Sequence, residues 1–344
     1  MECIRAALIG YGLAGKVFHA PLLQVTEGVE LAAVVSSDPA KVHADWPDLQ
    51  VETQIDAVLA DPTIELVVLA TPDHLHAPQA LSALAAGKHV VIDKPFAVTI
   101  ADARRIAGTA EHCDRHVFVF HNRRWDADFL TLQSLVEAGE LGEVMHFESH
   151  FDRLRLEAGQ RWKDKRFGGV WQDLGPHLID QALSLFGMPE AVWADIAIQK
   201  REGHAPDFAH VVLRYARTRA ILHISQLVPD HGLRFAVHGT RASYIKRGLD
   251  VQEEQGSNGM TPREAAWGID PDEGVLTGVD GAARPIANKR GCYQAFYENV
   301  RDCLSAGASP AVPTRHAIAV MEVLRAAQES AQERREIPIL PDPR

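Results

Sequence analysis

Near its start the chain reads Ile4-Arg5-Ala6-Ala7-Leu8-Ile9-Gly10-Tyr11-Gly12-Leu13-Ala14-Gly15, and this stretch decides how the first part of the chain folds. The apolar run predicts a buried strand, and GxGxxG directly after a strand is typical of a turn that leads into a helix. Gly10 allows the tight turn, Gly12 lets the backbone approach a pyrophosphate, and Gly15 lets helix and strand pack closely. The helix N-terminus offers N–H groups to phosphates. We therefore expect a dinucleotide site that includes Gly10, Gly12, Leu13, Ala14 and Gly15; a purely structural turn is the alternative.

The same pattern of short apolar runs separated by helical segments continues to His121. The predicted strands are Ile4–Ile9, Leu31–Val35, Leu66–Ala70, Val90–Ile92 and Val117–Phe120. The predicted helices lie near Val17–Thr26, Ile55–Ala60, Pro78–Ala86 and Ile100–Glu111. Nearly continuous apolar strands that alternate with helices predict a doubly wound parallel sheet, so residues 1–121 are expected to form an α/β Rossmann domain.

The pattern changes after His121, where longer strands with alternating apolar and polar residues follow. Helices are predicted at Asp128–Ala138, Gln294–Ala306 and Ala317–Glu333. The predicted strands are Glu143–Phe151, Glu190–Ile198, Phe208–Ala216, Ala220–Leu227 and Leu233–His238, and Asp250–Ala287 is predicted to be a loop. Alternation indicates a sheet with one open face, so residues 122–344 are expected to form an α+β domain with an open, mostly antiparallel sheet.

The composition suits a soluble enzyme of two domains. The chain has 344 residues and a formal net charge of −11, which makes nucleic acid an improbable partner. No signal peptide and no membrane-spanning run is predicted. The four cysteines are scattered without a CxxC pair, so we expect neither a zinc site nor a disulfide framework, and a cytoplasmic protein.

The residues after the second strand bear on the choice between NAD and NADP. A carboxylate there would bind a ribose 2′-hydroxyl, but the chain has Ser36 and Ser37 at the expected position. Lys41 could reach a 2′-phosphate, whereas Asp38 argues for NAD. We expect NADP in preference to NAD.

Two other strand ends carry polar residues. Asp93 and Lys94 follow the strand Val90–Ile92, at the edge where doubly wound sheets bind ligands, although a solvated loop lysine is an equal alternative. Thr71 and Pro72 follow the strand Leu66–Ala70. Beyond them, His76 either begins a helix or contacts the cofactor.

The segment Asp173-Leu174-Gly175-Pro176-His177 is the main catalytic candidate in the second half. Proline favours the first helical position, so a helix is predicted to begin near Pro176. His177 in its first turn would stay neutral and suit a general base, and Asp173 would orient a substrate hydroxyl. Alternatively, Asp173 caps the helix and His177 packs. No partner cluster supports a metal site at Asp173, His177 and Asp180.

Further substrate contacts are predicted from polar residues on either side of the domain junction. Asn122, Arg123 and Arg124 suit a hydroxylated or anionic ligand, but ion pairs that pin the domains together are an equal alternative. Asp152 and Trp162 are predicted to flank the site from the second domain.

Together these segments resemble the glucose–fructose oxidoreductase/inositol dehydrogenase/rhizopine catabolism (Gfo/Idh/MocA) family. The resemblance rests on Gly10–Pro21 (GYGLAGKVFHAP), on Lys94-Pro95 as the EKP motif, and on Asp173–His177 as the DxGxH motif. HNRRWD at 121–126 with DLGPHLIDQ at 173–181 is most similar to the branch that contains NADP-dependent scyllo-inositol dehydrogenases. Asp93 replaces the usual Glu, which shortens the reach of the carboxylate, and Asp73 stands where many members have Asn.

The resemblance implies an oxidoreductase that uses NADP or NAD and acts on a polyol, inositol or sugar. Lys94 would bind substrate and cofactor, His177 would exchange a proton with the reacting hydroxyl, and Asp173 would hold the substrate. It also implies a homodimer or homotetramer formed through the C-terminal sheet. An NAD-dependent glycosidase and a non-catalytic nucleotide sensor of the same fold are the alternatives.

Overall fold

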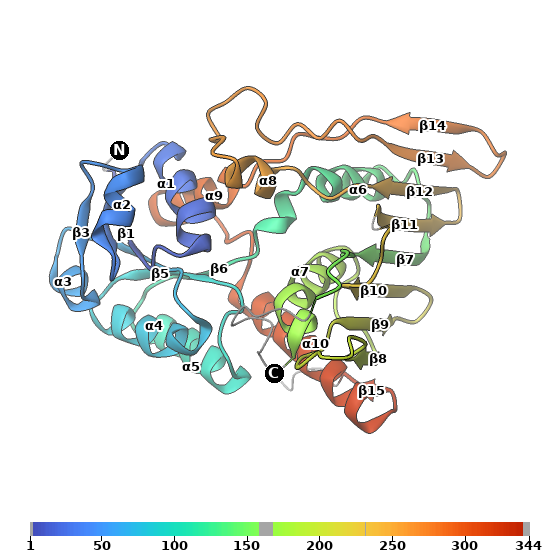
Figure 1. Cartoon of the computed structure of the whole chain (residues 1–344), viewed down its shortest axis with the longest axis horizontal. Coiled ribbons are helices and arrows are strands. Elements are labelled where there is room, and N and C mark those ends of the chain that lie inside the picture. Colours follow the sequence, from blue (N-terminus) through green and yellow to red (C-terminus); the bar gives the residue numbers. More distant parts are fainter. Residues whose placement is uncertain (1–2, 158–167, 231, 340–344) are drawn as a thin grey trace. The chain divides into compact units, whose positions relative to one another are not determined.

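The computed structural model describes residues 3–157, 168–230 and 232–339, which form two compact units (Figure 1). The first unit comprises the described residues through Trp125 together with Gln252–Gly268 and Cys292–Ile318. The second comprises the described residues of Asp126–Val251 and Ile269–Gly291 and those from Ala319 onward. The chain thus returns to the first unit twice after it has entered the second.

The first unit is built on a six-stranded parallel sheet with the order β3-β2-β1-β4-β5-β6. Its strands are β1 (Ile4–Ile9), β2 (Val29–Val35), β3 (Gln50–Glu52), β4 (Leu66–Leu69), β5 (His89–Asp93) and β6 (Val117–Phe120). All four residues of β4 are buried, as expected for a strand covered on both faces. The predicted doubly wound parallel sheet is confirmed.

Helices cover both faces of this sheet, with α1 and α9 on one side and α4 and α5 on the other (Figure 1). The helical elements of the unit are η1 (Gly15–His19), α1 (Ala20–Val25), α2 (Pro39–Asp45), α3 (Ile55–Ala60), η2 (Asp73–Leu75), α4 (His76–Ala85), α5 (Ile100–His112), η3 (Asn122–Trp125), α8 (Gln252–Ser257) and α9 (Gln294–Ala306). Buried His19 joins η1 to α9, since its Nδ1 lies 2.6 Å from the hydroxyl of Tyr297. Burial lowers the pKa of His19 to about 4, so its imidazole is uncharged near pH 7.

The second unit is built on a nine-stranded sheet with the order β14-β13-β12-β11-β7-β10-β9-β8-β15. Among the strand pairs of the described residues, only β7–β10 is parallel, which confirms the predicted, mostly antiparallel sheet. The strands are β7 (Val144–His150), β8 (Ala191–Ala197), β9 (Phe208–Arg214), β10 (Arg219–Ser225), β11 (Leu233–Gly239), β12 (Ala242–Arg247), β13 (Gly274–Gly278), β14 (Ala283–Ile286) and β15 (Ile337–Pro338).

One face of this sheet is packed and the other is open. Along β9 buried residues alternate strictly with partly exposed ones. The buried side chains join those of three helices in one core: α6 (Ala127–Glu137), α7 (Gly169–Phe186) and α10 (Thr314–Glu333), the last of which begins in the first unit. Among the described residues, none of the helices has the length and apolar character needed to cross a membrane.

The prediction of a continuous loop over Asp250–Ala287 is wrong, because α8, β13 and β14 lie within it. Tertiary contacts rather than sequence periodicity hold α8 in place: the side-chain amide of Gln252 donates to the Trp125 carbonyl and accepts from the Tyr293 N–H. β13 and β14 form a hairpin at the sheet edge in which Leu276 is buried. In a segment rich in Gly and Asp, short helices and edge strands leave no clear periodic pattern in the sequence.

Backbone contacts explain why glycine occupies two positions of the turn after β1. Gly10 has φ +98°, and a Cβ there would lie 2.7 Å from the Ala70 carbonyl oxygen. A Cβ on Gly15 would lie 2.2 Å from the Gly10 carbonyl oxygen, so only glycine lets the helix begin this close to the strand. Gly12 differs, since no heavy atom lies within 4 Å of its Cβ position.

We therefore predict that Gly15→Ala and Gly12→Ala differ sharply in their effect on the stability of the cofactor-free protein. Gly15→Ala should lower the free energy of unfolding by about 1–3 kcal/mol, because the backbone must shift to accept the methyl group. Gly12→Ala should change it by less than about 0.5 kcal/mol. The midpoint of urea unfolding measures both. Equal losses in the two variants would contradict this account of the turn.

Candidate active site

The glycine turn leaves open space beside Gly12, the position where the backbone is expected to approach a pyrophosphate. The helix begins at Leu13, directly after the turn, and continues through η1 into α1. Leu13 is 66% exposed and the space beside Gly12 is open. The N-terminal N–H groups of a helix and an open glycine are what a dinucleotide phosphate requires. The turn therefore fits the predicted cofactor, with Ala14 in the same first helical turn.

The residues at the end of β2 form the N-terminus of α2. Asp38 caps this helix, because its carboxylate accepts the backbone N–H of Lys41 at 3.2 Å. Ser36 hydrogen-bonds to the backbone of Asp38, and Ser37 and Lys41 are exposed. The Asp38 carboxylate is thus used as a helix cap, while the Ser37 hydroxyl and the Lys41 ammonium belong to exposed side chains.

A side-chain network beside the glycine turn was not foreseen from the sequence. The Tyr11 hydroxyl donates to Asp45 at 2.9 Å, and the Trp46 indole donates to the same hydroxyl at 2.8 Å. Lys16 forms a 2.7 Å ion pair with Asp45. Burial and the neighbouring Asp45 carboxylate raise the pKa of Tyr11, which keeps it protonated. The network ties the turn to the end of α2; the aromatic residue between the two glycines was the only available signal.

The ends of β4 and β5 are joined through a histidine. His76, the first residue of α4, is buried, with its Nε2 2.9 Å from the Thr71 carbonyl oxygen and its Nδ1 2.8 Å from that of Pro95. Thr71 also lies beside the glycine turn, since its Cγ2 is 3.3 Å from the Cβ position of Gly10. Pro72 precedes η2. His76 therefore holds two strand ends together, and a direct cofactor contact remains a prediction.

Lys94 lies in the turn directly after β5. Its backbone N–H donates to the Asp93 carboxylate at 2.8 Å, and the Lys94–Pro95 peptide is cis. Both Asp93 and Lys94 are half-buried. The carboxylate thus shapes the turn that carries the lysine, at the edge of the sheet where the glycine turn also lies.

The η3 residues make contacts within the first unit. The buried Arg123 guanidinium pairs with Glu253 on α8, and Arg124 donates to the Ala311 carbonyl at 2.6 Å. Asn122 is also buried. Both arginines therefore anchor later segments of the chain to η3, and substrate binding by these three residues stays a prediction.

The predicted start of the catalytic helix near Pro176 is wrong, because α7 begins at Gly169 and Pro176 lies inside it. Val170 and Trp171 are buried in the same core as the rest of α7, and the Trp171 indole donates to the Leu324 carbonyl at 3.1 Å. Packing of this first turn extends the helix ahead of a proline that would otherwise start it.

The longer helix changes the surroundings of the two catalytic candidates. Asp173 lies within α7 and does not precede it, and His177 lies beyond the first turn, so the argument that the helix dipole keeps its imidazole neutral no longer applies. The four-residue spacing places both on one side of the helix. His177 is buried and Asp173 is half-buried.

Asp173 lines a cavity of the second unit that is rich in cationic side chains. In the described part of the chain its walls include Phe151, Arg153, Arg155, Asp173, Lys200, His204, Asp207, Ser225 and Gln226, but not His177. Trp162 lies outside the described residues. Asp152 is 5% exposed, accepts the Ser225 N–H at 2.9 Å and lies 3.1 Å from His150.

A fully buried arginine positions α7 on the sheet. Arg234 of β11 donates to Asp128 on α6 at 2.9 Å, to Ser149 on β7 at 2.7 Å and to Gln181 on α7 at 2.7 Å. The paired side chains are 1% and 0% exposed. A buried guanidinium is tolerated only when acceptors satisfy its N–H groups. Because one of these acceptors is Gln181, the network fixes the position of α7 against β7 and β11. A charged residue inside the apolar run Leu233–His238 was its sequence signal.

Comparisons with known proteins cover nearly the whole chain. Residues 4–121 match the oxidoreductase-family NAD-binding Rossmann fold, and residues 133–339 match the C-terminal α/β domain of the same family. The uncharacterised oxidoreductase YdgJ of Escherichia coli is 46% identical over 96% of this chain and 97% of its own. The Bacillus subtilis scyllo-inositol 2-dehydrogenase (NADP(+)) IolW is 36% identical over 98% and 96%.

A solved structure gives the same result. The YPO2259 protein of Yersinia pestis, named as a candidate oxidoreductase, superposes with a TM-score of 0.96 at 45% identity, covering 99% of this chain and 98% of that one. The glycine turn, the parallel sheet and both family matches agree, and the chain belongs to the Gfo/Idh/MocA family of NAD(P)-binding oxidoreductases.

Proposed function

We propose that the protein is an NAD(P)-dependent dehydrogenase or reductase that transfers hydride between the nicotinamide and a secondary alcohol or ketone of a polyol, inositol or sugar. The observation that carries this proposal is Lys94, an amine held directly after β5 at the same sheet edge as the glycine turn. The B. subtilis relative named as a scyllo-inositol 2-dehydrogenase supports the substrate class.

In the proposed mechanism the chain supplies acid–base chemistry and charge stabilisation. The bound nicotinamide supplies the hydride acceptor or donor. During alcohol oxidation His177 takes the hydroxyl proton as hydride leaves the same carbon, and the Lys94 ammonium stabilises the negative charge that develops on the oxygen. Asp173 accepts a hydrogen bond from a substrate hydroxyl and so fixes which carbon reacts. Residues 1–121 would hold the cofactor and residues 122–344 the substrate.

Lys94→Ala and His177→Ala are each expected to reduce kcat about 10²–10⁴-fold, because each removes a group that acts on the reacting oxygen. Binding of the reduced cofactor, followed by nicotinamide fluorescence, should persist in both variants. Ser184→Ala is the matched control for His177, since Ser184 is an exposed position of the same helix and its loss should leave kcat unchanged. Normal turnover in Lys94→Ala or His177→Ala would overturn the mechanism.

We propose NADP as the preferred cofactor. Ser36 and Ser37 occupy the place where a carboxylate would bind the ribose 2′-hydroxyl, the Asp38 carboxylate caps α2, and Lys41 is exposed beside them. The relative in B. subtilis is named as NADP-dependent.

Lys41→Ala should weaken binding of NADP about fivefold and leave binding of NAD unchanged, because an exposed ion pair with the 2′-phosphate contributes up to about 1 kcal/mol. Asp38→Asn keeps a helix-capping oxygen and should not alter the ratio of the two dissociation constants. Titrations of both cofactors against both variants decide the point. If Lys41→Ala weakens the binding of NAD and NADP equally, the lysine does not recognise the 2′-phosphate.

We also propose a homodimer or homotetramer that buries the open face of the second sheet. One row across this face runs from Trp193 through Val212 and Ile221 to Glu148, and beyond it through Ala236 to Ile245 and Val275. All but Glu148 are apolar, and Trp193 is 43% exposed. Such a stripe is typical of a protein interface. The four free cysteines suit the reducing cytoplasm in which we expect the protein to act.

Light scattering on the purified chain should give a mass of two or four chains, and Trp193→Glu should shift it toward one by placing a charge in the apolar row. Val279→Glu is the control, since Val279 is 83% exposed in the β13–β14 turn and outside the row. A wild-type mass of one chain would contradict the proposed assembly.

A further inference from the structure

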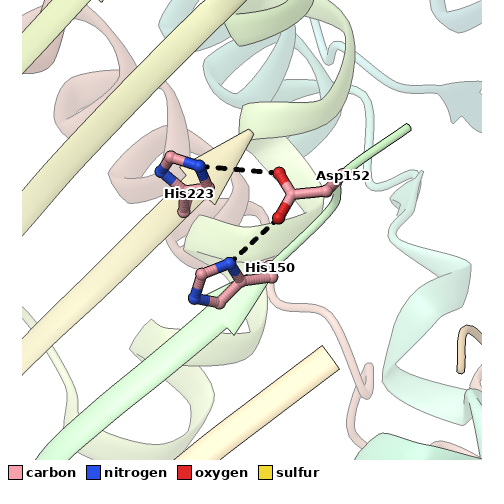
Figure 2. A group of neighbouring side chains, drawn as sticks. All are labelled: His150, Asp152 and His223. Carbon is pink, nitrogen blue, oxygen red and sulfur yellow. Dashed lines mark hydrogen bonds and ion pairs between the residues drawn. The ribbon is translucent and has the colours of Figure 1, made fainter. Parts of the chain in front are cut away.

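We propose that His150, Asp152 and His223 form a binding site for a divalent transition-metal ion of the zinc class in the second unit. One potential ligand atom from each residue lies within 4.8 Å of the others. In Figure 2 the Asp152 carboxylate lies beside both imidazole rings, and each ring turns a nitrogen toward one of its oxygens. Two imidazoles and a carboxylate are a donor set that zinc accepts.

Sheet register brings these residues together although 150 and 223 are far apart in the sequence. His150 and His223 are direct partners in the parallel β7–β10 pair, so their side chains leave the same face. Asp152 follows β7 by two residues and is held by the Ser225 N–H at the end of β10. The alternation along β7 also places His146 and Glu148 on this face.

The distances between potential ligand atoms suit a four-coordinate ion. The Nδ1 of His150 lies 3.1 Å from Oδ2 of Asp152, and the Nε2 of His223 lies 3.6 Å from Oδ1. Metal–ligand bonds of about 2.0–2.1 Å in a tetrahedron place neighbouring ligand atoms roughly 3.3–3.4 Å apart. The two spacings lie on either side of that value but involve different oxygens of the Asp152 carboxylate, so a rotation of Asp152 would bring one oxygen to both imidazoles. The three residues supply three ligands, and water would take the fourth position.

The outward-facing nitrogen of each ring has the partner that a metal ligand needs. The Nε2 of His150 lies 3.0 Å from the Glu148 carboxylate, and the Nδ1 of His223 lies 3.1 Å from Nδ1 of His210. If these nitrogens carry the protons, Nδ1 of His150 and Nε2 of His223 present lone pairs toward Asp152. Carboxylate–histidine–metal chains have this arrangement, in which the outer partner fixes the tautomer and the ring orientation.

Burial separates this cluster from an ordinary surface ion pair. The side chains of His150, Asp152 and His223 are 14%, 6% and 17% exposed. Side chains this far withdrawn from solvent favour coordination by protein atoms over hydration of the ion. The competing explanation is a hydrogen-bonded charge cluster with a protonated ring, and the two exclude each other because a metal ligand must be deprotonated.

The test is zinc binding to the untagged full chain in its solution assembly, after removal of metals with a chelator. Calorimetry should show one saturable Zn²⁺ site per chain. Co²⁺ should give the visible absorption bands of a four-coordinate site. His150→Gln and His223→Gln should abolish both signals, and Glu148→Ala should weaken Zn²⁺ binding about 10–100-fold by removing the outer partner of His150. Circular dichroism and cofactor binding report whether each variant is folded.

His238→Gln is the matched control. His238 lies on β11, and its Nδ1 pairs with Ser243, outside the three proposed ligands. It should bind Zn²⁺ like the wild type. The proposal fails if the wild type shows no saturable Zn²⁺ site, or if stoichiometric binding persists in either His150→Gln or His223→Gln. If these variants do not fold, the absence of Co²⁺ absorption bands in the wild type would overturn it.

Discussion

The common direction of the six strands in the first sheet is the constraint on which the cofactor half depends. Because β1, β2, β4 and β5 run parallel, the segments after them emerge at a single edge of the sheet. The strand order reverses between β1 and β4, and the glycine turn lies at this switch point. Gly10 can lie this close to the Ala70 carbonyl, directly after β4, only because glycine has no Cβ. The parallel topology thus brings the glycine turn, His76 and the Asp93–Lys94 turn to the same edge of the sheet.

In the second unit the buried charge of Arg234 determines where the candidate catalytic helix α7 lies on the sheet. Arg234 connects α6, β7 and α7 through Asp128, Ser149 and Gln181, so the helix that carries Asp173 and His177 cannot slide on the sheet without breaking charged hydrogen bonds. The opposite, open face carries two kinds of residue. An apolar row suits a second copy of the chain, and the cluster of His150, Asp152 and His223 suits a cation. The residues that position α7 and the two proposed binding surfaces therefore lie on different faces of one sheet.

The sequence predicted what depends on local pattern. GxGxxG after an apolar strand and the strand–helix alternation were enough for the Rossmann sheet, and alternation along β7 and β9 was enough for the open antiparallel sheet. It failed where tertiary contacts decide: α7 extends ahead of Pro176 because Trp171 is buried, and α8 is held by Gln252. No local pattern revealed that His223 lies opposite His150, because their contact depends on strand register. The proposed metal site was therefore not expected from the sequence.

The most direct measurement is the absorbance of reduced nicotinamide while the purified protein is mixed with NADP or NAD and a panel of inositols and aldoses. We predict a substrate-dependent rise that is faster with NADP than with NAD, because hydride passes from a secondary alcohol carbon to the nicotinamide. The reverse reaction with the matching ketone should consume the reduced cofactor. If the cofactor binds but no polyol or ketone changes the absorbance in either direction, the proposed dehydrogenase is contradicted. Glycoside cleavage without net change in the cofactor would then indicate a glycosidase, and binding alone a nucleotide sensor.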